Sequence, residues 1–232
     1  KLRSLLKTAP WYSLASGVAA GLVAWLLAPV NSYRFLFLAL LAAIAAFGWR
    51  LRFRLLLLLI ALGVVVAAGD LFVAILFGIA VFLLAVSARE RFVSWEVGEL
   101  VVAITALLYS RAWYVSFLSP ASPEGAAWSH AFLYSALLPI VVIASDLLLP
   151  KDAVHQRPEI VLPFVLLWQV MVAVWFLPAS IYAKSFLFTG FAVCEMGYRL
   201  NGNQRVVGYF YASAILLIIA GWAVMRTSAS VF

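Results

Sequence analysis

Charged residues are scarce in this chain of 232 residues, which contains sixteen Lys or Arg and nine Asp or Glu. They make up 11% of the sequence, whereas hydrophobic residues make up 67% and the mean hydropathy is +1.11. A soluble globular domain has about 45–50% apolar residues, because more apolar surface than that cannot be hidden from water. The shortage of charge therefore excludes an ordinary soluble domain and predicts an all-α integral membrane protein.

Residues that bind metals or act as nucleophiles are also few. Cys194 is the single cysteine, which excludes an internal disulfide and a cysteine-rich metal site. The two histidines, His130 and His155, are too few for a haem pair or a di-iron cluster within one chain. Cys194 also has no neighbouring histidine that could activate it as a nucleophile. We therefore expect neither a metal nor a cofactor.

The positive excess follows a pattern that is typical of membrane proteins. A net charge of +7 would point to nucleic acid in a soluble protein. Here the cations gather in short clusters between apolar runs, as in the cytoplasmic loops of membrane proteins. Arg50, Arg52 and Arg54 form the strongest such cluster. We therefore expect a multi-pass protein of the cell membrane with a cytoplasmic N-terminus, surrounded by membrane lipids and with no nucleic-acid partner.

The apolar runs predict one polytopic helical domain over residues 1–232, without a soluble domain and with about nine crossings. In this threading the C-terminus lies outside, and all but four of the sixteen Lys and Arg face the cytoplasm. The expected crossings are residues 11–30, 32–49, two within 55–87, then 97–118, 130–149, 160–177, 180–200 and 207–224.

The stretch 55–87 is too long for one crossing and short for two. A single helix of this length would far exceed a bilayer core of about 30 Å. Arginines flank it on both sides, so the chain should leave the cytoplasm and return. We expect a short helical hairpin with its turn at Gly69-Asp70, and a re-entrant loop is the alternative.

The stretch 180–200 decides between nine crossings and eight. It carries Lys184, Glu195 and Arg199 but is otherwise apolar. If it crosses the membrane, Arg199 joins the cytoplasmic side, which favours nine. If it lies on the surface, there are eight crossings and both termini are inside.

Four charged residues inside or beside the apolar runs are the candidate ligand or ion sites: Asp70, Arg111, Lys184 and Glu195. Charges at bilayer depth are costly and usually face a protein interior or a cavity. Asp70 is an ordinary turn residue in a hairpin, but a re-entrant loop would carry it into the membrane. Arg111 belongs either to an interfacial aromatic girdle or to a contact with an anion or lipid headgroup.

Lys184 and Glu195 lie on one predicted helical stripe. Its members recur every three or four residues, and Lys184 and Glu195 are about 16 Å apart along the axis, so they cannot pair. Either each charge faces its own membrane interface, or the whole stripe faces the bundle interior or a partner chain. The stripe comprises Ser180, Lys184, Phe188, Phe191, Glu195 and Arg199.

A different motif concerns packing rather than chemistry. Gly17 and Gly21 form a GxxxG pattern, which permits close contact between membrane helices. We expect them to pack within the chain or against another chain. Asp146, Glu96 and Glu99 are interpreted as residues of the membrane interface.

Three function classes fit these observations. We place first a non-catalytic structural, assembly or accessory subunit of a larger membrane complex, associated with other membrane chains or with itself. A small transporter or channel using Arg111, Lys184 and Glu195 is the first alternative. The second is an intramembrane lipid hydrolase using Asp70 and Glu195. Over a few residues, the Gly69-Asp70 step resembles small polytopic lysoplasmalogenase-type hydrolases, but a second aspartate of that pattern is missing.

Overall fold

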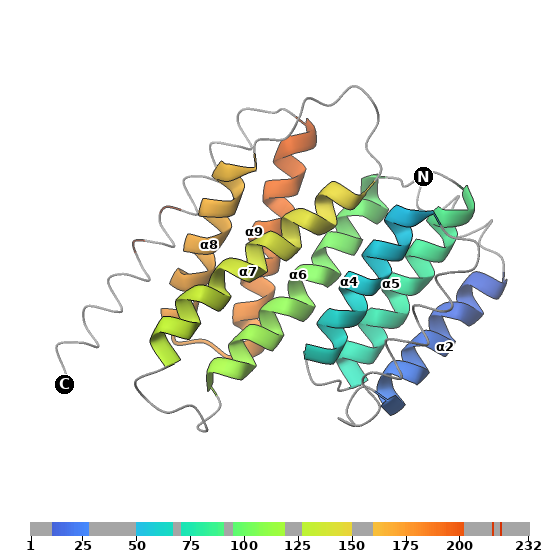
Figure 1. The fold of residues 1–232 in the computed structure, drawn as a ribbon, viewed down its shortest axis with the longest axis horizontal. Helices are drawn as coiled ribbons and strands as arrows, with labels where there is room; N and C mark the ends of the chain where they lie inside the picture. Colours follow the sequence, from blue (N-terminus) through green and yellow to red (C-terminus); the bar gives the residue numbers. More distant parts are fainter. Residues whose placement is uncertain are drawn as a thin grey trace.

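All regular structure in the described part of the chain is helical (Figure 1). The computed structural model describes residues 11–27, 50–66, 71–90, 95–118, 127–149 and 160–201, together with Ile215 and Ile219. The expected segment 32–49, most of 207–224 and the candidate Asp70 lie outside these residues. The helices are α2 (Trp11–Leu27), α4 (Leu51–Val66), α5 (Leu71–Glu90), α6 (Trp95–Leu118), α7 (Ala127–Leu148), α8 (Val161–Phe176) and α9 (Ile181–Asn201).

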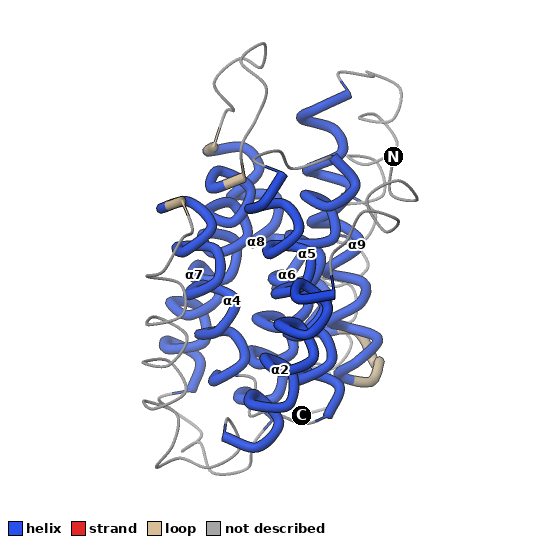
Figure 2. The backbone as a smooth tube through the Cα atoms, turned by 90° about the vertical axis from the view of Figure 1, so that its right-hand side faces the viewer, coloured by secondary structure: helices blue, strands red, loops and turns tan. Residues whose placement is uncertain are grey.

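These helices form one bundle in which the chain passes up and down between two ends (Figures 1 and 2). Helices α2, α5 and α4 lie on one side of α6 and α7, α8 and α9 on the other, and α4 also contacts α7 directly. One end, here called the arginine end, holds the starts of α4, α6 and α8 and the last residues of α5, α7 and α9. The opposite end, here called the aromatic end, holds the starts of α5, α7 and α9 and the last residues of α6 and α8.

The two helices of the expected hairpin are present and in contact, but they extend further than predicted, and the expected turn at Gly69-Asp70 lies outside the described residues. Helix α4 begins at Leu51 and α5 runs to Glu90, so both continue beyond the apolar stretch 55–87. Arg52 and Arg54 thus belong to the first turn of α4 rather than to a loop. Arginine is a good helix former, and its long side chain can leave the helix to reach a polar surface. Charge marked the edge of the apolar run, not the edge of the helix.

Proline and serine set the break between α8 and α9. Leu177 caps α8 in an extended conformation, with φ −69° and ψ 138°. A residue that precedes proline avoids the helical region, so Pro178 ends α8 at this point. Helix α9 then starts after Ser180, whose Oγ accepts a hydrogen bond from the backbone N–H of Ala183 at 3.3 Å. The sequence-predicted limits of this break therefore hold to within one or two residues.

The core lies around α6 and joins the two halves of the bundle. Its largest fully buried side chains include Tyr114, Phe77 and Phe188, one each from α6, α5 and α9. Tyr109 on α6 reaches across to α4, where its hydroxyl donates to the carbonyl of Leu59 at 2.7 Å. Its ring also fills the space beside Gly63, where an added Cβ would lie 2.8 Å from ring carbon Cε2.

Several of the described helices are shorter than a threading of nine full crossings requires. Only Leu71–Ala88, within α5, is both long and apolar enough to span a membrane among the described residues, with mean hydropathy 2.8. Three further apolar helices are shorter: Trp11–Leu27, Ser135–Leu148 and Val161–Phe176. A helix of 16 residues, such as α4 or α8, is about 24 Å long, less than a bilayer core of about 30 Å. The described helices thus do not support nine spans by length and composition.

Candidate functional site

The predicted stripe on α9 faces the inside of the bundle. The exposed fractions are 7% for Lys184, 0% for Phe188 and 5% for Glu195. Helix α9 packs along α6 and touches α8, and these two helices cover the stripe. Of the two interpretations of the stripe, the structure therefore favours the inward one, although Ser180 at its start is exposed.

Lys184 of α9 caps the C-terminal end of the neighbouring helix α8. Its Nζ donates a hydrogen bond to the backbone carbonyl of Trp175 at 2.7 Å. Trp175 lies in the last turn of α8, where carbonyl groups lack a partner within the helix and carry the negative end of the helix dipole. A buried ammonium group at this place both satisfies a carbonyl and is stabilised by the dipole. The position of Lys184 thus has a structural explanation that needs no substrate.

Aromatic rings surround this contact. The rings of Trp113 and Trp175 meet edge to face with centroids 5.3 Å apart, and Trp113 meets Tyr114 at 4.9 Å. The Tyr114 hydroxyl donates to the carbonyl of Met171 on α8 at 3.3 Å. Together these contacts fasten α6 to the last turns of α8, beside the hydrogen bond of Lys184.

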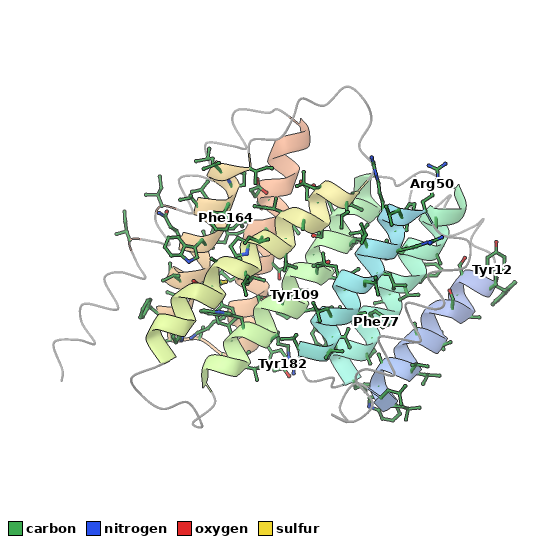
Figure 3. The ribbon with its side chains drawn as sticks, viewed as in Figure 1. Tyr12, Arg50, Phe77, Tyr109, Phe164 and Tyr182 are labelled. Carbon is green, nitrogen blue, oxygen red and sulfur yellow. The ribbon has the colours of Figure 1, made fainter. Side chains whose placement is uncertain are left out.

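Arg111 makes a separate contact on the other side of α9. Its guanidinium carbon lies 5.6 Å from the centre of the Tyr182 ring, which is within the range of a cation–π interaction. The Tyr182 ring in turn meets Phe72 of α5 edge to face at 6.2 Å, and Phe72 meets Phe186 at 6.4 Å. We call these four residues, Arg111, Tyr182, Phe72 and Phe186, the Arg111 cluster. Figure 3 shows Tyr182 at the aromatic end of the bundle, far from Arg50.

The candidate charges do not come together. Tyr182 and Lys184 are two residues apart on α9, about 200° around the helix axis, so the side chain that Arg111 contacts and the side chain of Lys184 leave α9 on different flanks. Glu195 lies eleven residues after Lys184, toward the arginine end. Helices α6 and α9 run in opposite directions, and Arg111 of α6 lies beside Tyr182 of α9. Thirteen residues further along α9, Glu195 is therefore level with Gly98 of α6 and far from Arg111. Asp70 lies outside the described residues.

Buried hydroxyl groups in α6 and α9 are satisfied by their own helices. Thr105 donates to the carbonyl of Val101 at 2.8 Å, and Thr189 donates to the carbonyl of Ser185 at 2.7 Å. Ser185 donates to the carbonyl of Ile181 at 2.9 Å. Such local bonds let a hydroxyl sit in an apolar interior. These groups therefore contribute polarity without forming a chain of bonds from one helix to the next.

Asp146 was interpreted as an interface residue, but the structure buries it. Its exposed fraction is 4%, near the end of α7. A signal for this was present in the sequence, because Leu138, Val142 and Asp146 recur every four residues and so share one helix face. Leu138 and Val142 are buried, and the aspartate continues their stripe.

Gly17 and Gly21 lie where α2 crosses α5. A Cβ added to Gly17 would lie 2.8 Å from both the carbonyl oxygen of Gly78 and the Cβ of Phe82. At Gly21 it would lie 3.1 Å from the carbonyl oxygen of Ala74. The two backbones approach closely because these positions have no side chain. The sequence interpretation missed Gly78, whose place inside a long apolar run was the available signal.

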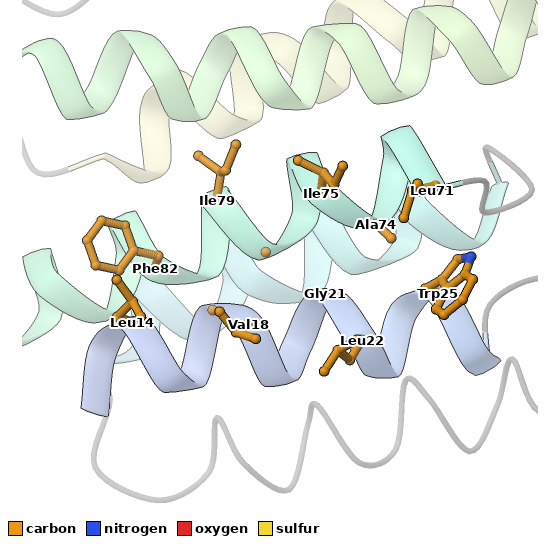
Figure 4. Close-up of a pocket in the computed structure, with 12 residues that line it drawn as sticks. Leu14, Val18, Gly21, Leu22, Trp25, Leu71, Ala74, Ile75, Ile79 and Phe82 are labelled. Carbon is orange, nitrogen blue, oxygen red and sulfur yellow. The ribbon is translucent and has the colours of Figure 1, made fainter. Parts of the chain in front are cut away.

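This crossing forms the floor of an apolar groove of about 360 Å³ on the outside of the bundle (Figure 4). Side chains of α2 and α5 form its two walls, and most of its large side chains are about half exposed. Its lining consists of Leu14, Gly17, Val18, Gly21, Leu22, Trp25, Leu71, Ala74, Ile75, Gly78, Ile79 and Phe82.

Within the described ranges, no three His, Cys, Asp or Glu side chains are close enough together to hold a metal ion. Comparisons with known proteins found no matching family model, no matching curated protein and no matching solved structure. Any function must therefore be argued from the residues themselves.

Proposed function

We propose that this chain is a polytopic helical membrane protein with about nine crossings that acts as a non-catalytic structural, assembly or accessory subunit of a larger membrane complex. The observation that supports a membrane location is that the outer surface of the bundle carries large apolar side chains, as its core does, while charged groups are buried inside. Lys184, Glu195 and Asp146 are buried, together with several hydroxyl groups, whereas large apolar side chains point outward. In water the opposite distribution is expected, since exposed apolar patches are limited in size on soluble monomers.

The outward apolar residues follow whole helix faces. On α2, Leu14, Val18, Leu22 and Trp25 are 48–56% exposed, and on α5 the same holds for Leu71, Ile75 and Ile79 at 44–57%. Because α5 also buries its opposite face, it is apolar all around, as expected of a helix between protein and lipid. Helices shorter than the bilayer are compatible with this location if the bilayer thins locally or flanking residues reach its surface.

The ends of the bundle support the proposed orientation. Arg50, Arg52 and Arg54 lie at the arginine end, where Arg89 and Arg199 also occur near the ends of α5 and α9. Arg111 and Lys184 are the described cations of the aromatic half. This difference fits a cytoplasmic arginine end under the positive-inside rule. A cytoplasmic N-terminus and a C-terminus outside remain part of the proposal.

The arrangement of the candidate charges supports a subunit rather than a catalyst or transporter. Arg111 lies on Tyr182, Lys184 on the α8 carbonyl, and Glu195 toward the other end of the bundle. A transport site needs several such groups around one ligand. The hydrolase alternative needs Asp70 near Glu195. Helix α5 begins at Leu71 at the aromatic end, whereas Glu195 lies in the part of α9 toward the arginine end.

The membrane location is tested by washing membranes from expressing cells with alkaline carbonate. We expect the chain to stay in the membrane pellet and to be released only by detergent. Recovery in the carbonate supernatant would show a peripheral or soluble protein and overturn the proposal.

The subunit role is tested on protein extracted under mild conditions, by native mass spectrometry. We expect a fixed stoichiometry with another membrane chain or with a second copy. The opposing result is a monomer that alone supports ion or solute flux in proteoliposomes, with the flux abolished by Lys184→Met and Glu195→Gln. That result would establish the transporter alternative.

A further inference from the structure

The Arg111 cluster combines a cation with a continuous apolar surface at one end of the bundle. Arg111 lies seven residues before the end of α6, about 10 Å along the axis. Tyr182 and Phe72 lie in the first turns of α9 and α5, which both begin at this end. Arg111 is half-buried, whereas Tyr182 and Phe186 are 49% and 54% exposed. The cluster is therefore open to the surroundings on its aromatic side.

The electrostatics at this place favour an anion. A guanidinium binds phosphate oxygens through two parallel N–H donors. Helices α5 and α9 both begin here, and a helix start carries a partial positive charge. A tyrosine at the same level fits the belt of aromatic residues that line the bilayer surface.

Two apolar stripes lead away from the Arg111 cluster in the same direction. Helices α5 and α9 both run from this end toward the arginine end, and Phe72 touches both Tyr182 and Phe186. On both helices the stripes recur at three- or four-residue spacing and stay at least partly exposed. They comprise Phe72, Leu76, Ile79 and Leu83 on α5, and Tyr182, Phe186, Gly190 and Val193 on α9.

Gly190 leaves additional room on this surface. It is exposed, and a Cβ added there would meet nothing within 4 Å. Between Phe186 and Val193 no side chain therefore projects from α9 at Gly190, which leaves space for a flexible hydrocarbon chain lying along the helix.

We propose that the Arg111 cluster binds the phosphate of a phospholipid headgroup and that one acyl chain of that lipid lies along the α5 and α9 stripes. The proposal rests on the membrane location proposed above. It names a ligand class and a specific place on the protein, which the membrane location alone does not. Tyr182 holds the guanidinium at the surface by its cation–π contact, and the apolar stripes select a lipid over a soluble phosphate.

The test compares lipid retention of protein variants in detergent by native mass spectrometry. Purified protein is loaded with a diacyl phosphatidylglycerol or with diacylglycerol of the same chains, and lipid that survives washing is counted. We expect the wild-type protein to retain the phospholipid at least about tenfold better than the diacylglycerol. Arg111→Gln should remove this preference, and Arg111→Lys should restore only part of it, because an ammonium lacks the paired donors.

Arg52→Gln is the matched control. Arg52 is exposed and lies at the opposite end of the bundle, so its loss should leave the lipid preference unchanged. If Arg111→Gln does not fold, as judged by helix content and unfolding temperature, Tyr182→Leu replaces it. This exposed position should tolerate the change, and the phospholipid preference should fall several-fold.

Three results would overturn the proposal. One is phospholipid retention at the wild-type level in both the Arg111→Gln and Tyr182→Leu variants. Another is equal retention of diacylglycerol, and the third is complete displacement of lipid by millimolar glycerol phosphate, which would indicate a site for a soluble anion. Protein that stays in carbonate-washed membranes but shows any of these results would refute only the lipid site, not the membrane location.

Discussion

Two helix crossings hold this bundle together by different means. At the α2–α5 crossing, Gly17, Gly21 and Gly78 bring two backbones into close contact. At the α6–α8–α9 junction, Lys184 and Tyr114 instead bond to backbone carbonyls among packed aromatic rings. The first contact depends on the absence of atoms, and the second depends on specific donors. The two should therefore fail under different substitutions.

The largest effect should come from filling the glycine crossing. Gly17→Leu would push α2 away from α5, because even its Cβ would lie 2.8 Å from a backbone oxygen. Overpacking costs about 1–3 kcal/mol and sometimes more, and we expect a value at the upper end because backbone cannot move aside. Unfolding in a titration with sodium dodecyl sulfate measures the loss.

Gly190→Ala is the matched control for that substitution, since nothing lies within 4 Å of its added Cβ. Alanine favours a helix over glycine by about 0.5–1 kcal/mol, so this variant should be slightly more stable than the wild type. If Gly17→Leu and Gly190→Ala changed the free energy of unfolding equally, the two helices α2 and α5 would not be in close contact at Gly17.

A smaller loss should follow removal of the Lys184 donor. Lys184→Met keeps much of the side-chain length but leaves the Trp175 carbonyl without the charged group at 2.7 Å. Hydrogen bonds that involve a charged group contribute about 1.5–3 kcal/mol, and we expect destabilisation in that range. The same detergent titration measures it, and tryptophan fluorescence should report a change around Trp175 and Trp113. An unchanged unfolding midpoint would show that the Lys184 hydrogen bond does not stabilise the fold, which would strengthen the transporter alternative.

The smallest loss should come from Tyr109→Phe. This substitution deletes the hydroxyl that donates to Leu59 on α4 at 2.7 Å but keeps the ring that packs on Gly63. A net contribution of about 0.5–1.5 kcal/mol is expected for a neutral hydrogen bond. Tyr109→Leu should cost more, because it also removes the ring from beside Gly63. Equal effects of the two variants would show that the hydroxyl alone matters.

The positions of most described helices could be predicted from the sequence. The break at Pro178 and the two helices within 55–87 followed from proline chemistry and from the spacing of charge clusters. The inner face of α9 was also visible, because Lys184, Phe188 and Glu195 share a helical spacing. The same spacing rule, applied to α7, could have shown that Asp146 is buried.

The contacts of the charged residues could not be predicted. Nothing in the sequence says that Lys184 bonds to Trp175, which is nine residues away across a chain reversal, or that Arg111 lies over Tyr182. Likewise, the GxxxG pattern indicated that α2 packs closely, but not that its partner is Gly78. These pairings depend on which helices become neighbours and in which rotation.

The sequence by itself determined the helical class, the approximate helix limits and the stripe of α9 that carries Lys184 and Glu195. Composition and periodicity decide these properties because they act within a single helix. The tertiary structure alone decided that Arg111 lies over Tyr182 of α9, that Lys184 of α9 bonds to the end of α8, and that the glycines of α2 meet α5. Those outcomes require the simultaneous packing of several helices, since each side chain can find its partner only after the backbones are in place.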